Sequence, residues 1–167
     1  MSAVQLLFTR RRHPGSALIR VATWSRWSHV ALVDGDEVIE AAAPHGVRRA
    51  SVGAAIDRAA RCALVELPAR DPAAVLAAAA SQLGKPYDWT AVLGLGLRRD
   101  WQEEDAWFCS ELVAWAFQHA GEPLFRAEVL RRVTPQHLWM LAPAPDPVLS
   151  LNPEDRAAFL FRRYRNG

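Results

Sequence analysis

The sequence predicts a protein built from both α-helices and β-strands, and three segments lead to this prediction. Residues 109–120 repeat apolar side chains at helical spacing, as expected of a core helix that begins near residues 105–108. Residues 29–41 read H-V-A-L-V-D-G-D-E-V-I-E-A, and β-rich runs on both sides of Asp-Gly are typical of a hairpin. Residues 62–67 form a short apolar run that predicts a buried strand.

Length and composition limit the classes of protein to consider. A chain of 167 residues is long enough to bury a substantial core, and we expect a single domain over residues 1–167. Apolar residues make up 51% and charged residues 23%, which indicates a globular protein rather than a disordered one. The net charge is +2 and the arginines are scattered, so we expect no nucleic-acid partner.

The sequence shows no membrane or export signal. No stretch of 18 apolar residues lacks a charge, so we expect no transmembrane segment, and the N-terminus does not resemble a signal peptide. The two cysteines do not form a disulfide framework and suit a reducing compartment. We therefore expect a cytoplasmic protein, although release by lysis or by a route without a signal would leave the same pattern.

The first half of the chain alternates strands and short helices. Residues 4–9 predict the first strand, and Ser16 is placed to cap a short helix that runs to Trp24. Residues 25–28 then form a loop before the hairpin. Residues 47–52 predict a third strand and residues 53–60 a short helix.

The second half of the chain is mainly helical before its last segments. A helix opens at Arg70 or Asp71, with Pro72 in its first turn, and ends at Gly84. The apolar residues 90–97 predict either a strained helix or the wall of a pocket. Further along lie a short helix at residues 134–141 and candidate closing strands at residues 148–151 and 157–161.

The hairpin places a histidine beside a carboxylate. If Asp34 and Gly35 are the central residues of the turn, His29 lies opposite Glu40, with Cβ atoms about 4.5–5.5 Å apart. If the turn shifts by one residue, Glu40 lies opposite Ala31 and becomes a diagonal neighbour of His29 on the same face. The two side chains are therefore neighbours in either register. A surface pair of this kind contributes little to stability and does not by itself indicate catalysis.

Cys109 is the candidate nucleophile. In the first turn of a helix, unpaired backbone N–H groups and the helix dipole favour a thiolate. The alternative is a small buried core residue, which is also what we expect of Cys62. The histidines are far apart in the sequence, and neither C-x-x-C nor H-E-x-x-H occurs. We therefore expect no metal site and no cofactor.

Three separated motifs resemble a known family. They are S-H-V-A-L-V with I-E-A about ten residues later, then G-K-P-Y-D-W, and then W-F-C-S-E-L-V. The last two resemble the G-x-P-Y and D-C-S-G-L-V segments of NlpC/P60 cysteine peptidases. Here the histidine motif precedes the cysteine, an order similar to that of the permuted branch, the YiiX/YebB-like proteins, with lecithin:retinol acyltransferase-like enzymes as more distant relatives. Residues 16–42 and 71–121 carry the resemblance.

The resemblance implies a papain-like α+β fold, in which the cysteine helix packs on a small antiparallel sheet or barrel that carries the histidine. It also implies that Cys109 is the nucleophile, His29 its base and acid, and Glu40 the group that orients the imidazole. Tyr87 matches the tyrosine of the family and is placed either to donate to an oxyanion or to pack on the core. The backbone N–H of Cys109 is the other natural oxyanion donor.

The sequence departs from the peptidase pattern at two positions. Phe108 replaces an aspartate and Glu111 replaces a glycine, and both changes put peptidoglycan specificity in doubt. Glu111 is placed either to bind a substrate amine or to pack against an arginine. Five tryptophans near these motifs are placed to line an apolar acyl or lipid groove or to fill the core. They are Trp24, Trp27, Trp89, Trp101 and Trp107, and the candidate substrate-binding residues are Trp27, Trp89, Trp107 and Glu111.

Two functions follow from these observations. The first is a cysteine hydrolase or acyltransferase that acts on an amide, ester or thioester through an acyl-enzyme at Cys109. Its substrate is a cell-wall peptide or an acyl lipid. The second is a module without turnover that keeps the fold and binds lipid or belongs to an assembly such as a phage particle.

Overall fold

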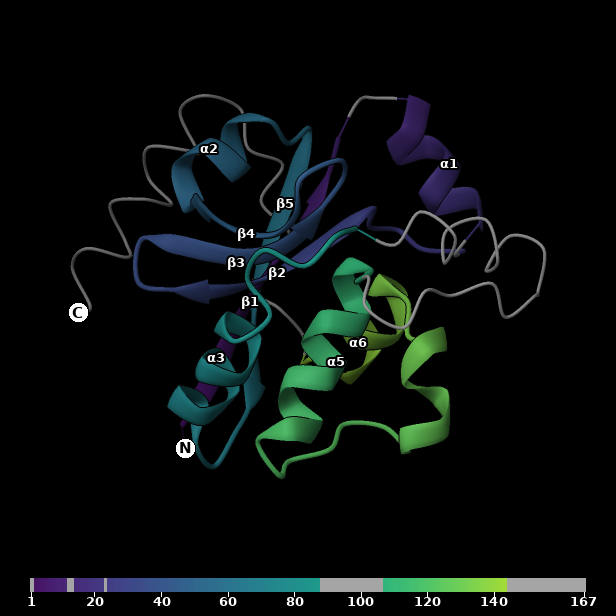
Figure 1. Ribbon diagram of the computed structural model, residues 1–167. Helices are drawn as coiled ribbons and strands as arrows, with labels where there is room; N and C mark the ends of the chain where they lie inside the picture. Colours follow the sequence, from purple (N-terminus) through teal and green to yellow (C-terminus); the bar gives the residue numbers. More distant parts are fainter. Residues whose placement is uncertain (1, 12–13, 23, 88–106, 144–167) are drawn as a thin grey trace.

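A five-stranded antiparallel sheet with the order β4-β3-β2-β1-β5 forms the centre of the structure (Figure 1). The computed structural model describes residues 2–11, 14–22, 24–87 and 107–143. The predicted segment at residues 90–97 and the predicted strands at residues 148–151 and 157–161 lie outside this part. The strands are β1 (Ala3–Arg10), β2 (His29–Asp34), β3 (Glu37–Ala42), β4 (Gly46–Ser51) and β5 (Arg61–Pro68).

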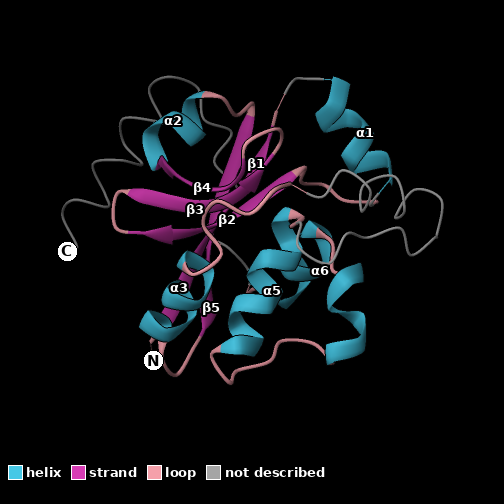
Figure 2. Cartoon of the chain, in the orientation of Figure 1, coloured by secondary structure: helices cyan, strands magenta, loops and turns pink. Residues whose placement is uncertain are grey.

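Helices lie on both faces of the sheet (Figure 2). They are α1 (Pro14–Ala22), α2 (Val52–Asp57), α3 (Pro72–Ala80), α5 (Cys109–His119), the 3₁₀-helix η1 (Ala127–Arg132) and α6 (Pro135–Leu141). Among the described residues, no helix combines the length and apolar character that crossing a bilayer needs.

Alternating side chains divide the interior into two cores. Leu6, Phe8 and Leu32 point to the larger core, where helices α3, α5 and α6 pack, whereas Leu7 and Val33 point to a smaller core under α2. This is the alternation expected of strands whose two faces are both covered. Helices on an antiparallel sheet make the α+β class that the sequence predicted.

The β2–β3 hairpin uses the second of the two registers considered from the sequence. Its turn is Gly35-Asp36 rather than Asp34-Gly35, and Val33 pairs with Val38. Of the two central residues only Gly35 has a positive φ, of 57°, which is the φ pattern of a type II′ turn with glycine first. A type I′ turn at Asp34-Gly35 would instead have required a positive φ at the aspartate.

Helix α5 is buried on most of its surface. Cys109, the first helical residue, is 1% exposed, and Leu112 and Phe117 are fully buried. The predicted stripe is therefore correct, but even the first-turn residues Ser110 and Glu111 are buried, because η1 and α6 cover the face away from the sheet. The Ser110 hydroxyl donates to the Val133 carbonyl at 2.6 Å and joins the first turn of α5 to the end of η1.

Polar caps decide where the other helices begin. The hydroxyl of Ser51 accepts from the Ala54 N–H at 3.1 Å, so α2 begins at Val52, one residue before the predicted start. Asp71 caps α3 ahead of Pro72, at one of the two starts that the sequence predicted, and Thr134 caps α6 at the start of the helix predicted over residues 134–141. The predicted cap at Ser16 is wrong, because α1 already begins at Pro14.

A tight contact between β4 and the loop after α3 positions the start of α5. The Val47 N–H donates to the Lys85 carbonyl at 2.8 Å, and the Trp107 N–H donates to the Pro86 carbonyl at 3.0 Å. Gly46 allows this approach, since a Cβ atom there would overlap the Lys85 carbonyl and the residue has φ of 75°. The loop therefore connects β4 to the residues directly before Cys109.

We expect Gly46→Ala to destabilise the protein more than alanine at any other described glycine. In Gly35→Ala the new Cβ atom meets no neighbouring atom. The variant therefore loses only the free energy of placing alanine in a left-handed backbone conformation, about 1–2 kcal/mol. Gly46→Ala adds the overlap with Lys85 to that cost, whereas Gly53→Ala lies in α2 in open space with an ordinary φ and should be neutral or slightly stabilising. Denaturant unfolding of the three variants measures the order, and equal losses at Gly35 and Gly46 would contradict the close contact.

Candidate active site

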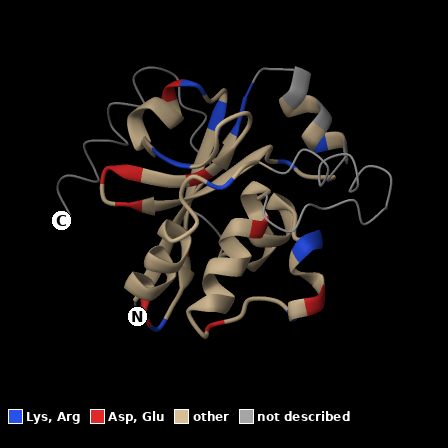
Figure 3. Ribbon diagram, viewed as in Figure 1, with Lys and Arg blue, Asp and Glu red and all other residues tan. Residues whose placement is uncertain are grey.

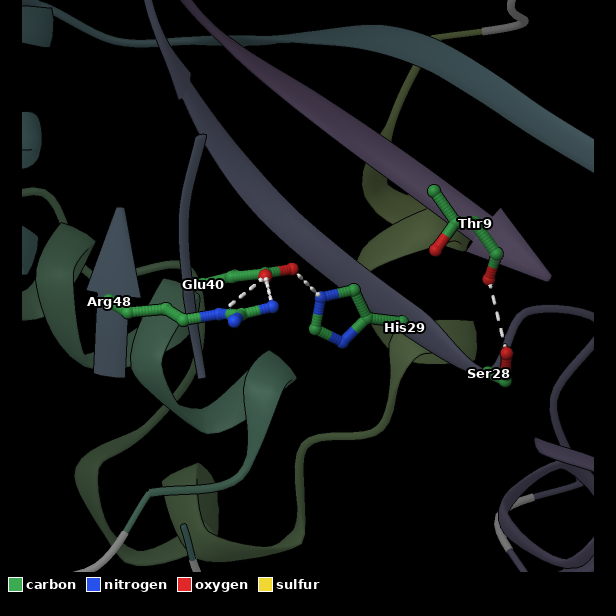
Figure 4. A network of polar contacts seen from close by, with 5 residues as sticks. All are labelled: Thr9, Ser28, His29, Glu40 and Arg48. Carbon is green, nitrogen blue, oxygen red and sulfur yellow. Dashed lines mark hydrogen bonds and ion pairs between the residues drawn. The ribbon is translucent and has the colours of Figure 1, made fainter. Parts of the chain in front are cut away.

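His29 is the first residue of β2, at the end of the sheet. The preceding residue is anchored to β1, because the Ser28 N–H and hydroxyl both donate to the Thr9 carbonyl, at 3.2 and 3.3 Å (Figure 4). Thr9 is also the residue of β1 that pairs with His29. The backbone on both sides of the imidazole is therefore held by the sheet.

The imidazole of His29 pairs with the carboxylate of Glu40. The distance from Nε2 to Oε2 is 2.7 Å, and the side chains are 15% and 1% exposed, respectively. The register of the hairpin continues to Glu40 opposite Ala31, which makes His29 its diagonal neighbour. The sequence prediction that these two side chains are neighbours is confirmed.

Arg48 holds the other oxygen of the same carboxylate. Its Nε and Nη2 atoms donate to Oε1 of Glu40 at 3.1 and 2.9 Å (Figure 4). Arg48 is not among the residues that the sequence predicted for the site. The strand predicted at residues 47–52 includes it, but the pairing of Glu40 with Arg48 depends on the register across the three-residue turn between β3 and β4, which no local pattern specified.

Cys109 completes the arrangement from helix α5. Its side chain is hydrogen-bonded to that of His29. Since Nε2 of His29 is engaged by Glu40, the remaining nitrogen, Nδ1, serves the sulfur, and Figure 4 shows the second ring nitrogen pointing away from Glu40. Three residues that lie up to 80 positions apart in the chain therefore form one line, from Glu40 through His29 to Cys109.

Charge interactions make this line an ion pair at neutral pH. Burial alone would lower the pKa of His29, but hydrogen bonds with Cys109 and Glu40 raise it to about 9. Burial alone would raise the pKa of Glu40, but the hydrogen bond with His29 and the contacts of Arg48 lower it to about 2. His29 is then a cation that donates to both Glu40 and Cys109.

The first turn of α5 lies beside this line. Phe108 occupies the N-cap position and makes no side-chain cap, which leaves the N–H groups of the first turn without a capping acceptor from that residue. Tyr87 is 8% exposed, forms a β-bridge with Trp107, and has its ring centroid 6.2 Å from that of Phe108. The structure thus places Tyr87 close to the start of α5, and its role as an oxyanion donor stays a prediction.

The tryptophans expected near the site divide into different environments. Trp27 is 1% exposed and packs on Phe8 and Trp139, so of the two predicted alternatives it fills the core rather than lining a groove. Trp107 is 8% exposed, with its ring centroid 5.2 Å from that of Trp115. Trp24 is 92% exposed, and Trp89 and Trp101 lie outside the described residues.

Glu111 is 9% exposed and lies in the first turn of α5. A carboxylate at this end of a helix interacts favourably with the helix dipole, which accounts for its presence without a substrate. Cys62 is fully buried in the smaller core, as predicted.

The comparisons with known proteins agree with this geometry. A sequence model of the permuted papain-like amidase enzymes, the YaeF/YiiX or C92 family, matches residues 5–146. The chain belongs to this family. Its fold is accordingly papain-like with a permuted order. The predicted resemblance to YiiX-like proteins is confirmed.

One solved structure supports the fold. The crystal structure of the metalloprotein yiiX from Escherichia coli O157:H7 superimposes with a TM-score of 0.57 at 23% sequence identity. The match covers 71% of this chain and 66% of that protein, so the chain spans about 66% of its relative's length. A search of curated proteins found no match. Within the described residues of this chain, no group of three or more His, Cys, Asp or Glu side chains is placed to hold a metal ion.

The ion pair predicts how stability depends on pH. Glu40 has a pKa of about 2 against an ordinary 4.5, so its contribution is complete above pH 4.5 and is lost as the pH falls toward 2. His29 has a pKa of about 9 against 6.5, so its contribution is complete below pH 6.5 and is lost as the pH rises toward 9. We expect the highest free energy of unfolding between these limits, with losses on the order of 3 kcal/mol on each side.

Glu40→Gln tests the source of this dependence. In this variant the free energy of unfolding should fall less at acidic pH, because the titrating carboxylate is gone. It should also fall less at alkaline pH, because His29 has lost its anionic partner. Glu37→Gln is the matched control on the same strand, since Glu37 is 51% exposed and pairs with the surface residue Arg49. Unchanged pH profiles of unfolding in Glu40→Gln would show that the buried pair does not cause the dependence.

Proposed function

We propose that this member of the amidase family is a cysteine hydrolase that cleaves an amide bond through an acyl-enzyme at Cys109. The observation that carries the proposal is the position of His29, which contacts Cys109 with one ring nitrogen and Glu40 with the other, at 2.7 Å. A nucleophile, a base and a group that orients the base are the parts that nucleophilic catalysis of acyl transfer requires.

In the first half-reaction the sulfur of Cys109 attacks the carbonyl carbon and its electron pair forms the C–S bond. The carbonyl oxygen becomes an oxyanion, which the backbone N–H of Cys109 at the start of α5 is suited to stabilise. As the oxyanion collapses, the C–N bond breaks and Nδ1–H of His29 gives its proton to the leaving amine. The products are a free amine, a thioester at Cys109 and a neutral His29.

In the second half-reaction water replaces the amine. The neutral Nδ1 of His29 accepts a proton from water as its oxygen attacks the thioester carbonyl. Collapse of the second oxyanion breaks the C–S bond and releases the carboxylic acid and the thiolate. Glu40 remains ionised and keeps the Nε2–H of His29 donating to it throughout, which leaves Nδ1 available for both proton transfers.

The substrate that we propose is a peptide-like amide. Membership of an amidase family favours an amide over an ester, and the deeply buried first turn of α5 suits an extended chain better than a bulky group. Acyl lipids and transfer of the acyl group to an acceptor other than water are the competing outcomes of a substrate screen.

The exposure of Cys109 favours a second candidate function, a binding module without turnover. The residue is only 1% exposed, as a structural cysteine would be, whereas His29 keeps 15% of its side-chain surface accessible. The two candidates therefore differ in whether the sulfur can be reached from the side of His29, and a small alkylating reagent measures this directly.

We expect iodoacetamide to alkylate Cys109 rapidly near neutral pH. A Cys62→Ala background removes the other buried thiol, so that the rate of alkylation reports on Cys109. His29→Ala should slow alkylation at pH 6–7, because the sulfur loses the base that is hydrogen-bonded to it. A Cys109 that stays unreactive, or that reacts alike with and without His29, favours the binding module.

We expect Cys109→Ser to lower amidase activity by at least about 1,000-fold on a screen of peptide amides, because serine lacks a thiolate at neutral pH. Cys62→Ser is the matched control, since Cys62 lies in the smaller core away from His29. Measurement of kcat/KM for both variants checks the prediction. Equal activity of wild type and Cys109→Ser would exclude an acyl-enzyme at this cysteine.

A further inference from the structure

Glu40 is surrounded by more positive charge than His29 supplies. Basic segments gather along β4, at the end of β1 and directly after α2 (Figure 3). Burial and the charge of Arg58 lower the pKa of Arg11, while Glu40 raises it, which places Arg11 close enough to interact with this carboxylate. Among the described residues, the hydrogen bonds to Glu40 come from His29 and Arg48 alone.

The two oxygens of Glu40 have separate partners. Oε2 accepts from His29 at 2.7 Å, whereas Oε1 accepts two N–H groups of Arg48, at 3.1 and 2.9 Å. Rotation of the carboxylate about its last bond would break all three contacts at once. Because the Glu40 side chain is only 1% exposed, water has little access to it and would not replace the lost hydrogen bonds.

We propose that Arg48 is a positioning residue, which holds Oε1 of Glu40 so that Oε2 keeps the imidazole of His29 aimed at Cys109. The proposal rests on the proposed function. Arg48 touches none of the reacting atoms and acts only through Glu40.

The backbone supports this role. Arg48 lies directly opposite Glu40 in the β3–β4 pair, so their Cβ atoms are about 4.5–5.5 Å apart. The guanidinium can therefore contact the carboxylate directly. Two N–H groups in one rigid plane also fix the direction of an oxygen, which a lysine ammonium does not. The geometry of Arg48 is therefore specific to arginine.

Charge adds a second reason. During turnover His29 gives its proton away and becomes neutral, which leaves Glu40 as a buried anion without its imidazolium partner. Arg48 stays charged at any working pH and continues to balance the carboxylate in that half of the cycle. Glu40 therefore has no need to take up a proton or to turn away before His29 is protonated again.

The test is the pKa of His29, measured by NMR titration of the folded protein. The groups that face this imidazole are Cys109 from α5 and Glu40 from β3. In Arg48→Met the carboxylate is no longer held on Nε2, and we expect the pKa of His29 to fall from about 9 toward 6.5, by roughly 1 to 2 units. Arg48→Lys, which keeps the charge but not the planar pair of donors, should lie between wild type and Arg48→Met.

Arg49→Met is the matched control. Arg49 is the next residue of β4 and pairs with Asp34 at 2.8 Å and Glu37 at 3.2 Å on the surface, so its loss should leave the titration of His29 unchanged. A rise in the pKa of His29 in Arg48→Met would show that Arg48 acts only as a nearby positive charge. Either a rise or an unchanged pKa would overturn the proposal.

A double variant separates a local role from a general structural one. If Arg48 acts through Glu40, adding Arg48→Met to Glu40→Gln should change neither the pKa of His29 nor the alkylation rate of Cys109 any further. An additional fall in either would contradict the proposal. Neither readout needs turnover. A Cys109 that is not alkylated in the wild type would refute the proposed function, whereas the pKa of His29 in the Arg48 variants would still decide whether Arg48 is a positioning residue.

Discussion

The structure depends on a buried carboxylate. Placing an ionised glutamate at 1% exposure is costly unless both oxygens are paired, and Glu40 meets this requirement with His29 on one oxygen and Arg48 on the other. The three residues belong to β2, β3 and β4. A shift of one residue between any two of these strands would turn side chains to the opposite face and leave the charge unpaired. The carboxylate therefore favours a single register for half of the sheet.

Strand β4 links the two halves of the candidate site. Its Arg48 holds Glu40, while its neighbour Val47 exchanges backbone hydrogen bonds with the loop after α3, at 2.8 Å to Lys85 and 2.9 Å from Gly84. That loop is bonded in turn to Trp107, two residues before Cys109. The positions of Glu40 and of Cys109 thus depend on adjacent residues of one strand. His29 lies at the first residue of β2, where elements from both faces of the sheet are within reach of its ring.

Sequence patterns predicted the elements well where a local chemical signal existed. Asp71 and Thr134 begin helices because their side chains satisfy N–H groups within three residues, which any reader of the sequence can see. The His29–Glu40 pair was predictable because both registers of the hairpin put them on one face. The start at Ser16 was wrong, and the sequence left two registers of the hairpin open, between which only the packed structure chose.

The sequence by itself determined the candidate site residues: a cysteine at the start of a core helix, a histidine beside a carboxylate in a hairpin, and motifs in a permuted order. These are local facts, set by helical spacing, by strand alternation and by the order of residues in the chain. Only the tertiary structure decided that His29 meets Cys109, that Trp27 fills the core and that Arg48 completes the pairing of Glu40. Those outcomes depend on contacts between segments far apart in the chain, where the cost of burying charge and the packing of α5 on the sheet select one arrangement.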